Sequence, residues 1–179
     1  MTELDDFRFV CRILAEFCDQ RRIIETLKSI HDLSITDWEK WLQVEIMVFL
    51  RTHSDVRSIQ KEYRYQCDKR KTYHTNVYAD IYFERQYTNR DVGIVLELKT
   101  HNHTATCIDR MICDRQKIEK LRTNNIRSFW VVGFHLKDEK SPMVLKQYIC
   151  NQLNDKHGIK VKQLEIIPIK RTPFAVTIF

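Results

Sequence analysis

A strand-length apolar run near the middle of the chain, Gly93–Thr100, contains two charged residues. Side chains on a β-strand alternate between its two faces. Glu97 and Lys99 should therefore share one face, while the opposite face should be entirely apolar. Such a charged pair has two explanations. Either that face meets water, or the pair converges with a second acid on a metal ion, and Asp80 in the alternating run 76–84 is the candidate acid.

Composition limits the kind of protein that this chain can form. Its 179 residues, 43% of them hydrophobic, suit one domain with its own core and argue against a disordered chain. No apolar run approaches the roughly 20 residues of a transmembrane helix, so no membrane association is expected. The acidic start is unlike a signal peptide. This favours the cytoplasm, or delivery into a target cell's cytoplasm for a toxin domain. Six cysteines without a Cys-x-x-Cys pair favour reduced thiols over a zinc site.

Two helices are predicted ahead of the strands, over 4–31 and about 37–54, because apolar residues recur there at helical spacing. Thr36 stands three residues before Glu39, which is the spacing of a capping box. Glu45 falls on the same side of the second helix as large aromatic residues. A carboxylate buried there is costly unless it is paired, protonated or bound to a metal. The alternative is an edge position, where Glu45 reaches solvent or a lysine.

The remaining elements are predicted from alternation and apolar runs. Strands are expected over 58–67, 76–84, 93–100, 128–134, 159–169 and 174–179. Helices are expected over 104–123 and from Ser141–Pro142 toward Asn154. The predicted fold class is α/β (α+β), with helices flanking a central sheet in one domain. That domain has three parts: a helical region at 1–35, a core at 37–134, and a C-terminal helix with strands at 141–179.

The order of these elements and their acids resembles the PD-(D/E)xK nuclease superfamily, which includes restriction endonucleases, repair nucleases and some bacterial toxin nucleases. The matching residues are Asp80, the Glu97-Leu98-Lys99 triplet and Glu45 as the helical acid. Ala79 stands where the name-giving proline would be, a departure that is frequent in the superfamily. The resemblance covers 37–134 and implies a restriction-endonuclease-like core, a mixed sheet in αβββαβ order.

The resemblance implies a catalytic set and a cofactor. The catalytic residues would be Asp80, Glu97, Lys99, Glu45 and Gln116, with Lys120 as a further accessory candidate. Mg²⁺ or Mn²⁺ would be held by Asp80 and Glu97, with Glu45 directly or through water, because hard cations prefer oxygen ligands. The backbone carbonyl of Leu98 could supply another ligand. Lys99 would orient or help deprotonate the attacking water and stabilise charge in the transition state.

A basic excess, with a net charge of +6, fits a polyanionic partner. The helix predicted over 104–123 carries the residues expected to hold substrate phosphates, namely Arg110, Arg115, Lys117 and Lys120. The alternative for such a cluster is a solvated helix face.

The leading functional hypothesis is a metal-dependent endonuclease that hydrolyses phosphodiester bonds of DNA. A second is an RNase, such as a tRNA-cleaving toxin domain with a small acidic inhibitor protein as its partner. A third is a nucleic-acid-binding module without catalysis, and a fourth is an unrelated α/β domain with a chance E-x-K string. Restriction-type nucleases often pair to cut both strands, so a homodimer is also compatible with the resemblance.

Overall fold

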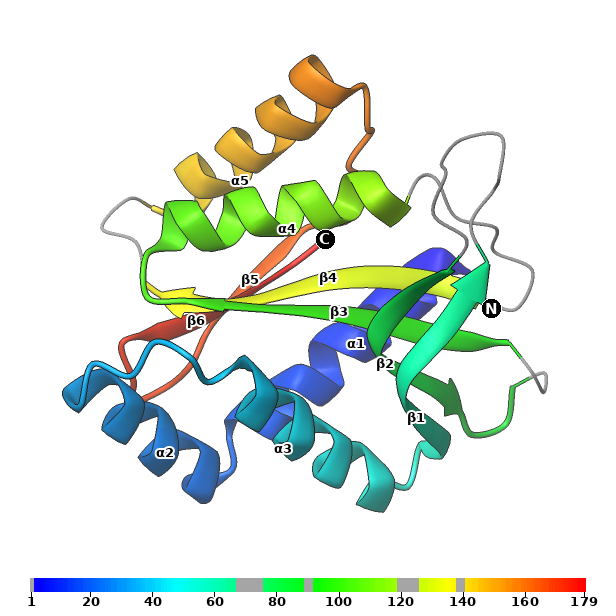
Figure 1. Ribbon diagram of the computed structural model, residues 1–179, viewed down its shortest axis with the longest axis horizontal. Helices are drawn as coiled ribbons and strands as arrows, with labels where there is room; N and C mark the ends of the chain where they lie inside the picture. Colours follow the sequence, from blue (N-terminus) through cyan, green and yellow to red (C-terminus); the bar gives the residue numbers. More distant parts are fainter. Residues whose placement is uncertain (1, 67–75, 89–91, 119–125, 138–140) are drawn as a thin grey trace.

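The computed structural model describes residues 2–66, 76–88, 92–118, 126–137 and 141–179 (Figure 1). The helices are α1 (Glu3–Cys18), α2 (Arg21–Asp32), α3 (Glu39–Thr52), α4 (Thr104–Ile118) and α5 (Pro142–Asn151), which continues into a π-helical turn at Gln152–Lys156. The strands are β1 (Val56–Gln66), β2 (Asn76–Arg85), β3 (Gly93–His101), β4 (Ile126–Leu136), β5 (Glu165–Pro168) and β6 (Phe174–Ile178).

The strands form one six-stranded mixed sheet in the order β1-β2-β3-β4-β6-β5. Only β3 and β4 run parallel among these neighbours, and the other pairs are antiparallel. A parallel pair needs a crossover connection, and α4 lies in the segment that joins β3 to β4. The chain is therefore α+β, with a mixed sheet flanked by helices, as the sequence predicts.

Helices cover both faces of the sheet (Figure 1). The layer of α1, α2 and α3 packs on the face that carries Ile94, Leu96 and Leu98. The layer of α4 and α5 packs on the opposite face, where Val95 is buried. This confirms the alternation predicted for β3. Within the described residues, no helix combines the length and the apolar character needed to cross a membrane.

Two predicted elements differ from the structure. The helix expected over 4–31 is interrupted after Cys18, where Asp19 caps α1 and Gln20 is extended before α2 begins. Both helices bury their apolar side in the same core, so the periodicity continues across the break and conceals it. The strand expected over 159–169 is confined to β5. Beyond Ile118, the predicted helix over 104–123 lies outside the described residues.

The sheet divides between β2 and β3. These strands pair only at Ile81–Leu96, Tyr82–Val95 and Phe83–Ile94. The rest of β2 pairs with β1 alone, and β3 continues beside β4 as far as His101. The fork between the two strands opens at Asp80 and Glu97, the next residues in register.

Candidate metal centre

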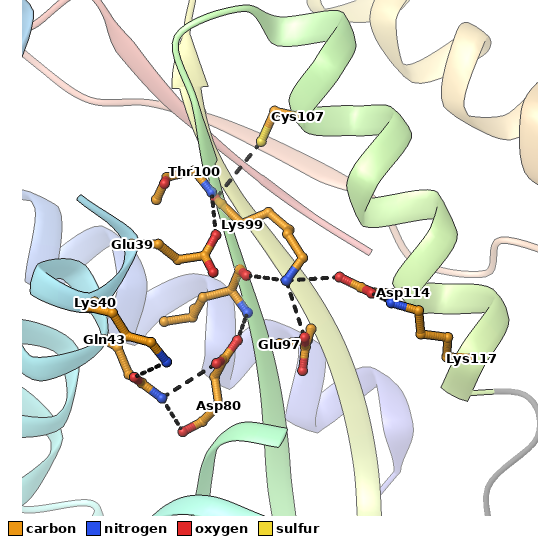
Figure 2. Close-up of polar contacts among 11 residues, drawn as sticks. Glu39, Lys40, Gln43, Asp80, Glu97, Lys99, Thr100, Cys107, Asp114 and Lys117 are labelled. Atoms are coloured by element: carbon orange, nitrogen blue, oxygen red, sulfur yellow. Dashed lines mark hydrogen bonds and ion pairs between the residues drawn. The ribbon is translucent and has the colours of Figure 1, made fainter. Parts of the chain in front are cut away.

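Asp80 is fixed at the fork by donors from two different elements (Figure 2). The main-chain N–H of Leu98 donates to its Oδ2 at 2.8 Å. From α3, the Gln43 side-chain amide donates to the Asp80 carbonyl at 2.8 Å and approaches Oδ1 at 3.4 Å. Gln43 is only 1% exposed, so this amide bridges helix and sheet inside the protein. Both the backbone and the carboxylate of Asp80 are thereby held in one orientation.

Lys99 gathers three oxygen acceptors around its ammonium group (Figure 2). Its Nζ lies 3.2 Å from Glu97 Oε1, 2.8 Å from the Leu98 carbonyl and 2.9 Å from Asp114 Oδ2. The Glu97 and Lys99 side chains are 19% and 17% exposed. The charged face of β3 is thus largely shielded from water, and of the two explanations for the pair, a strand face open to water does not hold.

The site has more buried carboxyl groups than buried lysines, since Glu97 and Asp114 both face Lys99. Burial, and after it the neighbouring charge of Asp80, raise the pKa of Glu97 to about 7. Burial alone would lower the pKa of Lys99, but the charges of Glu97 and Asp114 outweigh it and the pKa is raised overall. Lys99 is therefore an ammonium at neutral pH. A divalent cation bound beside Glu97 would lower its pKa and favour the carboxylate.

Glu39, which the capping-box spacing places at the start of α3, lies at the site. The expected capping box does not form, because the N-cap of α3 is Trp38 and it makes no side-chain capping bond. The Glu39 carboxylate instead accepts a hydrogen bond from the Thr100 N–H at 3.1 Å. Burial raises the pKa of Glu39, and the nearby charge of Lys99 opposes this. Glu39 lies one turn before Gln43, a spacing that places both on one helix face.

Glu45 does not join this cluster, contrary to the expectation that it is the helical acid. Its carboxylate forms an ion pair with Arg22 of α2. Each helical residue turns about 100°, so Glu45 points nearly opposite to Gln43, two residues before it. The structure corresponds to the alternative of an edge position, with an arginine as the partner.

Within the described part of the chain, the α4 residue that contacts the Lys99 ammonium is Asp114, and not the predicted accessory residue Gln116. Asp114 reaches Lys99, whereas Gln116 lies two residues further round the helix and is absent from the cluster's described contacts. Lys120 lies outside the described residues.

The three described basic residues of the predicted phosphate-binding set on α4 have different surroundings. Lys117 is 65% exposed and binds Asp114 Oδ1 at 2.5 Å, so it borders the acids. Arg115 instead lines a pocket with Trp130 and Phe179, and no residue of the acid cluster lines that pocket. Arg110 is exposed, and its charge contributes to lowering the pKa of His101, behind the effect of burial.

The oxygen atoms at the fork are of the type that a hard divalent cation prefers. The described residues contain no group of three or more His, Cys, Asp or Glu arranged to hold a metal. Mg²⁺, however, usually binds through one or two carboxylates and keeps several waters. Asp80, Glu97 and the Leu98 carbonyl provide such a set, and the excess of buried carboxylates favours a cation there.

A search against known protein families, curated proteins and solved structures found no match for this chain. A functional assignment therefore depends on the geometry of the site.

Proposed function

We propose that this protein is a Mg²⁺- or Mn²⁺-dependent endonuclease acting on DNA, with a centre of the PD-(D/E)xK type. The observation that carries the proposal is that Asp80 and Glu97 adjoin the last paired residues of β2 and β3, close enough for the charge of Asp80 to raise the pKa of Glu97, while Lys99 binds Glu97. Each acid comes from a different strand, and a purely structural ion pair has no need of the second acid. Buried charges that are not fully paired are expensive to keep, which supports a functional reason for them.

Each residue has a separate role in this proposal. Asp80, Glu97 and the Leu98 carbonyl would hold the cation, and Gln43 with the Leu98 N–H keeps the Asp80 carboxylate oriented. The bound cation would polarise the phosphate and lower the pKa of a bound water. The raised pKa of Lys99 favours an ammonium that stabilises developing negative charge and orients the nucleophile. It disfavours Lys99 as the base that deprotonates the nucleophile.

The surroundings of the cluster suit a phosphate backbone. Lys117 on α4 lies on one side of the acids, and Lys40 on α3 lies on the other, near Gln43 (Figure 2). Their side chains are 65% and 72% exposed, so both are accessible to a polyanion. Phosphate contacts of this kind fix a nucleic acid without reading its sequence. They support a nucleic-acid substrate in general, and the test must compare DNA with RNA.

The proposal is tested by incubating the protein with supercoiled plasmid, single-stranded DNA and total tRNA, each with Mg²⁺ and with EDTA. We expect plasmid cleavage that requires Mg²⁺ and is lost in Glu97→Ala. Cleavage of tRNA alone would transfer the proposal to an RNase. Cleavage at the wild-type level in Glu97→Ala would rule out the proposed centre, and cleavage of no substrate would overturn the proposal.

A further inference from the structure

Asp114 approaches Lys99 from the helix that covers this face of the sheet. Its side chain is 7% exposed, and its Oδ2 lies 2.9 Å from Lys99 Nζ. The other oxygen, Oδ1, binds Lys117 at 2.5 Å. A carboxylate buried to this extent is unfavourable without cationic partners. Asp114 belongs to α4 and is separate from the strand-borne acids of the fork.

Two of the three oxygen acceptors around Lys99 would also be ligands of a divalent cation, and the third would not. An ammonium group has three N–H donors, and here they face Glu97, the Leu98 carbonyl and Asp114. The first two are the oxygens that would hold Mg²⁺ in the proposed function, so Lys99 and the cation compete for them. Asp114 is the acceptor that the cation does not require.

Lys99 and Asp114 form an ion pair whose hydrogen-bond geometry is incomplete. Asp114 Oδ2 is buried, and among the described residues it has no hydrogen bond of ordinary geometry in addition to this ion pair. An ammonium that leaves Glu97 and the Leu98 carbonyl could therefore be accepted more fully by Asp114. Such a movement would keep the positive charge of Lys99 within the site.

We propose that Asp114 is a positioning residue that holds the Lys99 ammonium clear of Glu97 and the Leu98 carbonyl when a divalent cation is bound. Asp114 acts through Lys99 and touches neither the cation nor the substrate. This inference rests on the proposed function. It adds that α4 supplies the carboxylate that lets one site accommodate both a lysine and a metal ion.

The experiment is a double-mutant cycle of Asp114→Asn and Lys99→Met. The first measurement is the Mn²⁺ affinity of each variant, determined by calorimetry without nucleic acid. Asp114→Asn should weaken Mn²⁺ binding by about tenfold, within the range usual for groups that orient metal ligands. In the Lys99→Met background the same change should have an effect of less than about threefold, because the competing ammonium is gone. Asp109→Asn, on the same helix and bonded to Tyr148, is the matched control and should leave Mn²⁺ affinity unchanged.

A second readout separates positioning from support of the fold. Asp114→Asn should lower kcat for plasmid by about 10- to 100-fold with little change in KM, and Asp114→Glu should recover part of that loss. Thermal unfolding in EDTA checks that the variants fold, and Asp114→Ser takes the place of Asp114→Asn if the latter does not.

The outcomes distinguish this inference from the proposed function. An equally large effect of Asp114→Asn with and without Lys99 would overturn the positioning role, as would no effect in the wild-type background. Metal binding with the expected cycle but no cleavage of any nucleic acid would overturn the nuclease and leave the positioning role in place. A wild-type protein that binds no Mn²⁺ would overturn both.

Discussion

The main-chain N–H of Leu98 donates a hydrogen bond to the carboxylate of Asp80 at 2.8 Å, across the point where β2 and β3 separate. The bond uses an N–H that strand pairing leaves free at the fork. The break in strand pairing therefore provides a hydrogen-bond donor that holds the acid of the proposed centre. The Leu98 carbonyl, on the same residue, faces Lys99. One residue of β3 thus connects the acid and the amine of the proposed centre.

Replacing Asp80 tests its role as a cation ligand. Asp80→Asn can still accept from the Leu98 N–H, so the fold should persist and the unfolding temperature should change little. Its weaker metal ligation should reduce Mg²⁺-dependent cleavage by about 100-fold or more, because a charged ligand is lost. Plasmid cleavage and thermal unfolding measure the two effects. Activity at the wild-type level would remove Asp80 from the centre.

Replacing Lys99 should separate rate from metal affinity. Lys99→Met removes the charge that we assign to transition-state stabilisation, and cleavage should fall by about 100- to 1,000-fold. Mn²⁺ affinity should be maintained or rise, because the ammonium no longer occupies Glu97 and the Leu98 carbonyl. Single-turnover cleavage and calorimetry provide the comparison. A loss of affinity without a loss of rate would reverse the role assigned to this lysine.

Glu97 should make the metal-free protein less stable as the pH rises. Its pKa is raised from 4.5 to about 7 in the fold, chiefly by burial and by the charge of Asp80. Between these values the folded state binds more protons than the unfolded state, so the free energy of unfolding falls with increasing pH. The loss is at most about 3.5 kcal/mol, at roughly 1.4 kcal/mol for each pKa unit.

Urea unfolding in EDTA measures this effect. Wild type and Glu97→Gln should diverge between pH 5 and pH 8, with the variant gaining stability relative to wild type. A difference that is independent of pH would show that Glu97 is not perturbed in the fold.

Two acids on α3 form a matched pair of tests. Glu39 lies beside Thr100, near the charges of Lys99 and Asp80, so Glu39→Gln should weaken Mn²⁺ binding by several-fold, about 3- to 10-fold. Glu45 pairs with the half-exposed Arg22, so Glu45→Gln should leave Mn²⁺ affinity unchanged. It should lower the free energy of unfolding by less than about 1 kcal/mol. Calorimetry on both variants decides the assignment, and the opposite ranking would return Glu45 to the centre.

The strand-borne half of the site could be predicted from the sequence because period-two alternation is a local property. Val95, Glu97 and Lys99 share a face in the structure, as the pattern requires. Each face of β3 is covered by a different helical layer, so the alternation has a direct physical cause. The sequence also places Asp80 on a strand close to that of Glu97, but no local pattern indicates that the two strands separate there.

The helix-borne half could not be predicted in this way. Glu39, Gln43 and Asp114 reach the fork because α3 and α4 dock at particular angles, which no local pattern encodes. The pattern places Glu45 in the core because it shares a helix side with Trp41 and Phe49, whereas the structure pairs it with Arg22. Those aromatics are only partly buried at the margin of the core, whereas Trp38 is fully inside. The aromatic neighbours of Glu45 therefore predict a buried helix face, but in the structure that face lies at the margin of the core.

The most direct measurement for the central claim is an anomalous difference map from a crystal grown with Mn²⁺. The proposed centre requires a peak bonded to Asp80, Glu97 and the Leu98 carbonyl, with oxygen distances of about 2.0–2.3 Å and Lys99 turned toward Asp114. An absence of anomalous density at the fork, with Lys99 still bound to Glu97 and the Leu98 carbonyl, would contradict it.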